Sequence, residues 1–488
     1  MVDYADPDIW YDWVQNASLL LVYFFVRNAS EKIVDHKIID YWWYSAILVS
    51  LIAVKEVAYA YNIKADSTLG NPNILSSFLV MCFPVFVYKI FEPKIINKVI
   101  ATIALGLWAM ALYATHSWSG VIGSVVTLFL FFYFWIDNFS KRVFLYISTI
   151  IIIFIIWINF PVLELSLVKQ ISSDVRLYLW DGTLAMIEQN PFFGVGPGHW
   201  YVQFPYFRDI QIFILDKAVS ASRHAHNAWL QETAESGIFA GMLWILLPFL
   251  AWGSRFKYYH EKIDHFDKVL GIAMAGLLFT NMFDVNLEFQ TSQFFFAVIL
   301  GWLGRAAKPI THLKNPRWFL GALLALAIIC SMGMSCHLLG QYWYRQAIIA
   351  RHDENWDKAI QNYQKSIKFF PEMDVMYKLA YAFAQKKDLD SAMAAYFKVK
   401  DRAPLFADVN ANLGSLYAQK KQYGQAQKFF QIELALNPYH IQALQGLFMV
   451  YLAEHKWQSA ERLLRKIQVF YPDHPIAKKR FSDFLPST

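Results

Sequence analysis

Apolar runs of about 20 residues recur along the first two thirds of the chain and constrain its fold more than any other feature. As a helix, such a run is long enough to cross roughly 30 Å of hydrocarbon. Ten runs are centred near residues 18, 48, 82, 106, 127, 153, 245, 276, 297 and 328. Hydrophobic residues make up 57% of the chain and charged residues 17%, whereas soluble domains are about 45–50% apolar and about 25% charged. We therefore expect an all-α polytopic transmembrane helix bundle with a soluble part attached.

The basic residues predict which end of the bundle faces the cytoplasm, because cytoplasmic loops are enriched in Lys and Arg. Alternate short loops carry Arg27, Lys32, Lys37, Lys89, Lys94, Lys98, Lys141, Arg142, Arg255, Lys257, Lys262, Lys268, Arg305, Lys308, Lys314 and Arg317. The intervening short loops contain only Lys55 and Lys64. We therefore expect the N-terminus, the long loop from about 164 to 236 and everything after about 340 to lie outside.

Charge and cysteine content add two constraints. The formal net charge is +6, and residues 341–488, with 21 basic and 14 acidic groups, carry the excess. This basicity fits either an acidic partner or a solvated surface. The three cysteines, Cys82, Cys330 and Cys336, all lie in apolar runs, so they support neither a disulfide framework nor a zinc site.

The C-terminal residues contain an internal repeat. Prolines recur 33, 34 and 34 residues apart, at Pro371, Pro404, Pro438 and Pro472. The same period links Ala359, Ala392, Ala426 and Ala460, and also Trp356, Leu389, Tyr423 and Trp457. A helix-turn-helix unit of this length, with a small residue at the packing contact and Pro after the second helix, resembles the tetratricopeptide repeat. Such repeats stack into a solenoid that binds peptides or proteins, so we expect a protein partner.

The external loop begins with a predicted amphipathic helix. Asp174 is a plausible N-cap, and Asn190-Pro191 ends the helix. Its apolar positions recur at helical spacing, at Leu177, Trp180, Leu184 and Ile187. We expect this face to lie against the membrane surface or the bundle. Arg176 in the first turn suits a phosphate ligand, because helix N-termini favour anions and the guanidinium forks onto phosphate; a snorkelling interfacial Arg is the alternative.

A glycine-rich turn follows, Gly194-Val-Gly196-Pro-Gly198. The spacing is neither a dinucleotide fingerprint nor a P-loop, since no strand precedes it and Pro197 interrupts it. We expect a tight turn with exposed backbone amides, which either contact a ligand or do not.

Two histidines stand before the next span, in Arg223-His224-Ala-His226-Asn227. His226, Leu230 and Thr233 would share one face of a helix that continues into the membrane. An imidazole titrates near pH 7 and accepts a hydroxyl proton, so His226 is a candidate general base. Ordinary interfacial histidines or the start of a metal site are the alternatives, although positions i and i+2 diverge on a helix and no carboxylate-His pattern supports a metal.

Together these motifs resemble the O-antigen ligase and polymerase superfamily of bacterial membrane proteins, over roughly residues 40 to 305. The resemblance rests on Gly70-Asn-Pro-Asn73, Arg176-x-x-x-Trp180, Pro191-x-x-Gly194-x-Gly196-x-Gly198 and His226-Asn227 with nine residues before Gly237. The chain departs from the family at Ala240, where a Gly is frequent, and at Ser117-Trp118-Ser119, where an SR pair is common. Family ligases have twelve spans, which implies two missing N-terminal helices here and agrees with an external start.

The resemblance implies an activity at the outer face of the bacterial inner membrane. Family members transfer a glycan from an undecaprenyl-diphosphate carrier to an acceptor hydroxyl, in lipopolysaccharide or polysaccharide biosynthesis, without a nucleotide sugar and without a cofactor or metal. By matching position, His226 would be the catalytic base and Arg176 would bind the diphosphate. The weaker substrate-binding candidates are Arg223, His224, Asn227, Gly196 and Gly198.

The residues are consistent with this chemistry without the resemblance. A diphosphate leaves readily, so the enzyme mainly needs to place a hydroxyl, remove its proton and neutralise phosphate charge. One His and one Arg suffice. Asp388-Leu-Asp390 imitates a metal-binding DxD but falls in a repeat turn, where we expect solvent. Asp284 and Glu288, in a short external loop, would bind acceptor, pair with Arg223 or be solvated.

We therefore divide the chain into N-terminal transmembrane helices (1–163), an external catalytic loop (164–236), C-terminal transmembrane helices (237–340) and a tetratricopeptide-repeat domain (341–488). The leading function is a membrane glycan transferase of the O-antigen ligase type, with a lipid, glycan or protein acceptor and no nucleic-acid partner. A polysaccharide polymerase and a protein O-oligosaccharyltransferase are the alternatives within this class. A non-catalytic membrane scaffold for the repeats is the rival from another class, and scarce charge inside the spans disfavours a transporter.

Overall fold

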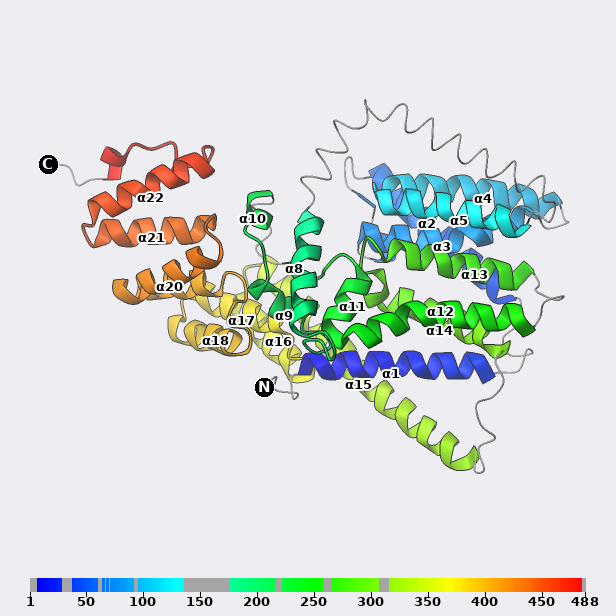
Figure 1. Ribbon diagram of the computed structural model, residues 1–488. Coiled ribbons are helices and arrows are strands. Elements are labelled where there is room, and N and C mark those ends of the chain that lie inside the picture. Colours follow the sequence, from blue (N-terminus) through cyan, green and yellow to red (C-terminus); the bar gives the residue numbers. More distant parts are fainter. Residues whose placement is uncertain are drawn as a thin grey trace.

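The computed structural model describes residues 7–28, 37–59, 64–65, 67–69, 71–91, 95–135, 175–215, 222–258, 265–306 and 316–484. Every regular element within these ranges is an α-helix or a short 3-10 helix, which confirms the all-α prediction. Figure 1 shows a helix bundle, a loop region and a stack of repeats that follow one another along the molecule. The predicted span near residue 153 and the predicted N-cap Asp174 lie outside the described residues.

The bundle contains the other nine predicted spans, each as a helix. These are α1 (Pro7–Asn28), α2 (Lys37–Tyr59), α3 (Pro72–Ile90), α4 (Ile95–Ala114), α5 (Trp118–Trp135), α12 (Ile238–Tyr258), α13 (His265–Thr280), α14 (Gln290–Leu303) and the first part of α15 (Pro316–His352). Within the described ranges, five helices are long and apolar enough to cross a membrane, namely α3, α4, α5, α12 and α15. The remaining four are shorter or interrupted by charges such as Asp40 and Lys55.

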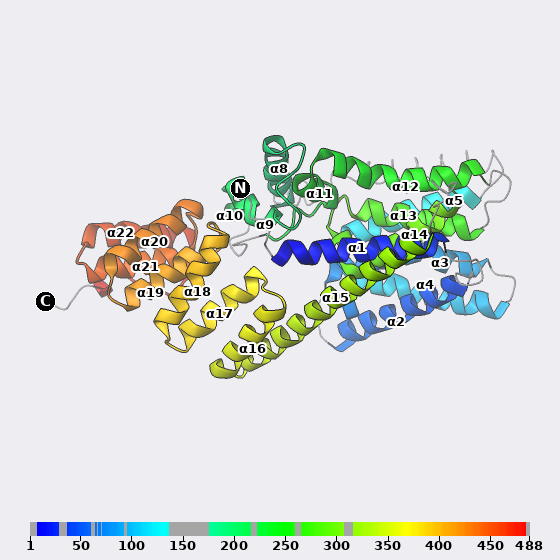
Figure 2. The same cartoon turned by 90° about the horizontal axis from the view of Figure 1, so that it is seen from below.

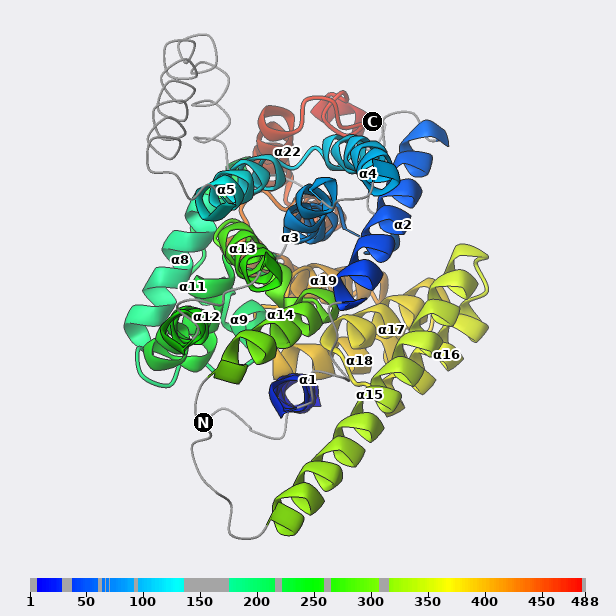
Figure 3. The same cartoon turned by 90° about the vertical axis from the view of Figure 1, so that its right-hand side faces the viewer.

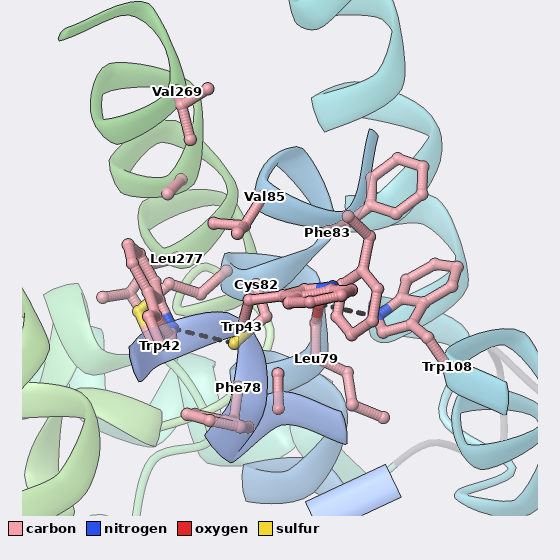
Figure 4. Packing of buried hydrophobic residues seen from close by; sticks show 14 of the residues in the cluster. Trp42, Trp43, Phe78, Leu79, Cys82, Phe83, Val85, Trp108, Val269 and Leu277 are labelled. Carbon is pink, nitrogen blue, oxygen red and sulfur yellow. Dashed lines mark hydrogen bonds between the residues drawn. The ribbon is translucent and has the colours of Figure 1, made fainter. Parts of the chain in front are cut away.

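Helix α3 forms the centre of the bundle. In the end-on view it lies among α2, α4, α5 and α13 (Figure 3), and 83% of its apolar stretch is buried. Two tryptophans from neighbouring helices close around it. The indole Nε1 of Trp42 donates to Cys82 Sγ (2.9 Å), and that of Trp108 donates to the Leu79 carbonyl (2.8 Å; Figure 4). Because a buried indole N–H needs an acceptor, these bonds satisfy the donors of Trp42 and Trp108 within the core.

The outer helices present apolar side chains outward. Only 28% of the apolar stretch of α4 and 11% of that of α12 are buried inside the protein. An apolar surface of this extent is stable only against hydrocarbon. The chain is therefore a multi-pass membrane protein.

Basic side chains hold contacts at one end of the bundle. At one end Lys89 pairs with Asp40, Arg255 Nε donates to Asp267 (3.0 Å) and Arg305 Nε donates to the Val26 carbonyl (2.9 Å). The start of α1, the loop region and the start of the repeats all gather at the opposite end (Figure 1). This is the grouping that the basic loops predict, since the three segments expected outside share one end.

The repeats form four stacked helix pairs (Figure 2). The end of α15 pairs with α16 (Trp356–Phe369), α17 (Met373–Gln385) with α18 (Leu389–Arg402), α19 (Val409–Gln419) with α20 (Tyr423–Leu436), and α21 (Ile441–Ala453) with α22 (Trp457–Phe470). The four periodic alanines are fully buried, and each periodic proline follows the second helix of a pair. Asp388 caps α18 by accepting from the Ser391 amide (3.2 Å), so the DxD imitation is a turn.

One helix joins the membrane part to the repeats. Helix α15 has 37 residues and runs without a break through the expected boundary at residue 340. At about 1.5 Å per residue it is roughly 55 Å long. The first repeat thus begins on a continuation of the last membrane helix.

Candidate functional site

The loop region, residues 175–236, has a small core of its own. It contains α8 (Val175–Gln189), α9 (Trp200–Gln203), the 3-10 helix Phe204–Tyr206, α10 (Gln211–Leu215) and α11 (Ala228–Ser236). Trp200 is fully buried, stacks on Phe204 at 4.3 Å between ring centroids and donates from Nε1 to Thr183 Oγ1 (3.0 Å). Helix α8 lies across the direction of the bundle helices (Figure 1), as a helix along the membrane surface would.

The core of the loop region packs on a different face of α8 from the apolar face that the spacing predicts to lie against the membrane surface or the bundle. Leu179, Gly182, Thr183 and Met186 face the core, whereas Leu177 and Leu184 are exposed. Gly182 explains the choice, because a Cβ there would meet the Phe204 ring at 2.7 Å. The exposed leucines lie on the side left for a membrane surface, one of the two contacts expected for this helix.

The glycine-rich turn is closed by Glu235 rather than left open. The Gly198 amide donates to Glu235 Oε2 (2.7 Å), the Trp200 amide to Oε1 (3.2 Å), and the Gly196 amide to the Glu235 carbonyl (2.9 Å). Gly194, Gly196 and Gly198 all have positive φ, and a Cβ at Gly194 would lie 2.3 Å from the Glu235 backbone. The expectation of exposed amides at this turn is therefore wrong: the glycines allow the turn to wrap a carboxylate of its own chain.

His226 does not lie on a helix that continues into the membrane, which corrects the sequence prediction. It stands before α11 with φ of +52°, and Asn227 caps the helix by accepting from the Trp229 and Leu230 amides (both 3.1 Å). Helix α11 then ends at Ser236, and Gly237 with φ of +87° separates it from α12. Asn227 thus holds the turn that presents His226.

A buried carboxylate holds the His226 ring. His226 Nδ1 lies 3.3 Å from Asp284 Oδ1, and the side chain of Asp284 is only 7% exposed against 33% for His226. A carboxylate only accepts, so in a neutral His226 ring Nδ1 carries the proton and Nε2 presents a lone pair. Asp284 is therefore neither solvated nor paired with Arg223, as the sequence had left open. The Glu288 side chain lies outside the described residues.

Arg176 acts on the same carboxylate. Burial alone would raise the pKa of Asp284, but the hydrogen bond and charge of His226, the Val285 amide and the charge of Arg176 together hold that pKa below its usual range. Asp284 is therefore ionised at neutral pH. Asp284 links the predicted base His226 with the predicted phosphate-binding residue Arg176, which lie 50 residues apart in the sequence.

Arg223 and His224 face another part of the structure. Arg223 reaches the second repeat, with NH1 3.2 Å from Glu372 Oε1 and NH2 3.3 Å from Asp374 Oδ2. The His224 ring lies beside Phe289, 6.3 Å between centroids. Sequence reasoning missed both acidic partners, because a contact across 149 residues leaves no local pattern.

One further group in the described ranges has metal-ligand residue types, in the repeats. The ligand atoms of Asp408, Glu433 and His440 lie within 4.8 Å of one another. His440 Nδ1 accepts from the Ala443 amide (3.2 Å), so the proton of a neutral ring is on Nε2, which lies 2.7 Å from Asp408 Oδ1. Arg208 of the loop region also interacts electrostatically with Asp408 and Glu433. These atoms are arranged for hydrogen bonds and for contact with a guanidinium rather than for a metal ion.

Two families match parts of the chain. Residues 102–245 match the family described as O-Antigen ligase, and residues 407–437 match the family described as Tetratricopeptide repeat. The first range includes Arg176, the glycine-rich turn and His226, and the second covers α19 and α20. Both resemblances drawn from the motifs are thereby confirmed. No curated protein matches the chain.

Proposed function

We propose that this protein transfers a saccharide from an undecaprenyl-diphosphate carrier to an acceptor hydroxyl. The observation that carries the proposal is the triad of His226, ionised Asp284 and Arg176 at one end of a membrane bundle. Two of the three residues fall in the range that matches O-antigen ligases. Coupling a base to a cation fits a reaction that removes a proton and releases a phosphate.

The base role belongs to Nε2 of His226. The acceptor hydroxyl gives its proton to Nε2 while its oxygen forms a bond to the anomeric carbon of the donor. The bond between that carbon and the diphosphate oxygen breaks, and the electron pair leaves with the diphosphate. Asp284 fixes the ring through Nδ1 and stabilises the imidazolium that forms, as the carboxylate does in serine hydrolases.

Arg176 has the complementary role. Its guanidinium donates several N–H bonds in one plane and stays charged at any physiological pH, which suits the growing charge on the leaving diphosphate. Its position in the first turn of α8 places it at a helix N-terminus, where the helix dipole also favours an anion. Weaker roles for Gly196 and Gly198 lose support, because their amides already bind Glu235.

The proposed setting is the outer face of a bacterial inner membrane. It is supported by the basic residues at the end of the bundle opposite to His226. Lipid, glycan and protein acceptors correspond to a ligase, a polymerase and a protein O-oligosaccharyltransferase, and all three share this chemistry. A non-catalytic scaffold is the rival, and it would not require His226.

The test is transfer by the full-length protein in liposomes that contain an undecaprenyl-diphosphate-linked saccharide and acceptor. His226→Ala and Arg176→Ala should insert and fold normally and abolish transfer. His116→Ala is the matched control, because His116 is an exposed histidine that also has positive φ (+53°) and follows α4 at the same end of the bundle. Full transfer by His226→Ala would exclude the base role and favour the scaffold.

A further inference from the structure

A cavity of about 350 Å³ lies where the loop region, the bundle and the repeats meet. Neither His226 nor Asp284 nor Arg176 lines it. The cavity borders their site at Ala228. The Ala228 amide donates to the carbonyls of Asn281 (3.0 Å) and Asp284 (3.1 Å), and both Ala228 and Asn281 line the cavity. Its size is that of small-molecule sites, which hold roughly 300–1,000 Å³.

The inner end of the cavity reaches between membrane helices and is lined by both apolar and polar side chains. Trp244 of α12, Leu278 of α13 and Leu287 line this end. Helices α1 and α15 border it through Asn16 and His337. An alkyl chain entering from the bilayer would pack against Trp244, Leu278 and Leu287, whereas a folded protein could not enter between these helices.

The outer end carries carboxylates and rings. Glu232 and Glu235 come from α11, and Glu372 and Asp374 from the repeats. Trp229 and Phe370 add flat apolar faces from the same two sides. The four carboxylates outnumber the neighbouring cations Arg223 and Lys378, which pair with Glu372 and Asp374. Glu235 also accepts from the Gly198 and Trp200 amides. A diphosphate would be repelled here, whereas sugar hydroxyls donate to carboxylates and sugar rings pack on aromatic faces.

We propose that this cavity binds an amphiphile with a neutral, hydroxyl-rich head, and that the repeats form part of its wall. The head group lies between Glu232 and Glu372, and the alkyl part points towards Trp244 and Leu278. That this ligand is the acceptor of the transfer reaction rests on the proposed function, because the cavity adjoins the His226 site; the binding itself does not. The repeats then contribute to substrate recognition directly, in addition to any protein partner.

The binding test uses a dodecyl maltoside bearing a diazirine in its alkyl chain, with the full-length protein in lipid nanodiscs. Illumination should label peptides that contain Trp244, Leu278 or His337. Gln341→Trp, which fills the cavity from α15, should reduce this labelling about tenfold, the effect of roughly 1.4 kcal/mol. Tyr342→Trp is the matched control, because the neighbouring Tyr342 is exposed. Glu232→Gln, which keeps the shape of the side chain and removes its charge, should also weaken labelling. It serves as the test if Gln341→Trp does not fold.

Competition identifies the head group that the site recognises. Excess dodecyl maltoside should displace the label, and dodecyl dimethylamine oxide, with the same chain and no sugar, should not. Equal displacement by both compounds would overturn the assignment to hydroxyl-rich heads. Labelling that Gln341→Trp and Glu232→Gln both leave unchanged would overturn the site.

The transfer assay separates this inference from the function on which it rests. Gln341→Trp should raise the KM for the acceptor and leave the KM for the lipid-linked donor unchanged. An unchanged acceptor KM would overturn the acceptor role. Sugar-specific labelling in a wild-type protein that transfers no saccharide would instead refute the proposed function and leave the binding site standing.

Discussion

Replacing Asp284 by Asn tests the proposed mechanism most sharply, because the structure predicts a graded effect. Asp284 Oδ1 accepts from both His226 Nδ1 (3.3 Å) and the Val285 amide (2.9 Å). In Asp284→Asn the side-chain carbonyl must occupy the Oδ1 position to keep both bonds. The amide group then takes the place of Oδ2, which is buried and has no hydrogen-bond partner among the described residues. The ring therefore keeps its tautomer and its orientation.

The expected loss follows from the charge alone. A hydrogen bond to a charged partner contributes about 1.5–3 kcal/mol and a neutral one about 1 kcal/mol. The difference, about 0.5–2 kcal/mol, corresponds to roughly 2- to 30-fold slower transfer. His226→Ala removes the base itself and should abolish transfer. The assay is single-turnover transfer in liposomes, with the unfolding temperature measured for each variant.

Asp267→Asn is the matched control. Asp267 is a buried carboxylate of α13, the helix that precedes Asp284 in the chain, but it binds Arg255 and Trp302 at the far end of the bundle. Its loss should lower stability without a comparable loss of transfer at a temperature where the protein is folded. The mechanism would be refuted if Asp284→Asn were as inactive as His226→Ala, or if it transferred at the wild-type rate.

Three further predictions concern stability. Lowering the pH from about 5 through the depressed pKa of Asp284 should narrow the difference in unfolding temperature between wild type and Asp284→Asn. The reason is that a carboxylate with a lowered pKa stabilises the fold above about pH 4 and stops doing so once it is protonated. A temperature difference that widens on acidification would contradict the direction of the pKa shift. Gly237→Ala should lower the free energy of unfolding by about 2 kcal/mol or more, because a Cβ there would lie 2.1 Å from the Phe192 carbonyl oxygen and the residue has positive φ. Gly253→Ala, whose Cβ would have nothing within 4 Å, should change it by less than about 1 kcal/mol in the same denaturation experiment. A double-mutant cycle of Arg223→Ala and Glu372→Ala should give a coupling of at most about 1 kcal/mol, because Arg223 is 52% exposed, and a coupling several times larger would mean that this contact holds the repeats in place.

The features that the sequence predicted well are those carried by short stretches of chain. The alanine and proline columns of the repeats repeat a local packing contact every 34 residues, so their period alone places four helix pairs. Hydropathy locates the bundle helices for the same reason, since each must be apolar over its own length. Gly237 marked the end of α11, yet the helix was expected to continue, because the apolar pattern on both sides outweighed a single glycine.

The features that were missed depend on contacts between distant residues. Asp284 was named as a loop carboxylate, but its partner His226 is 58 residues away and only the fold brings them together. The glycine turn was expected to offer its amides to a ligand, because nothing in the sequence indicates that Glu235, 37 residues later, binds the amide of Gly198. The spacing of apolar residues in α8 left open whether that face meets the membrane surface or the bundle. It did not reveal that the core of the loop region packs on another face, where Gly182 allows close contact with Phe204.

Because helix α15 is uninterrupted, its number of residues sets the position of the repeats relative to the membrane helices. Each residue inserted near its middle would lengthen it by about 1.5 Å and rotate everything beyond by about 100°. An insertion of about seven residues, close to two turns, would nearly restore the angle. Such an addition would carry Phe370 and Glu372 away from α11 by roughly the width of a helix. The length of α15 therefore fixes both the distance and the angle between the membrane helices and the repeats, and it determines their junction as much as any side chain there.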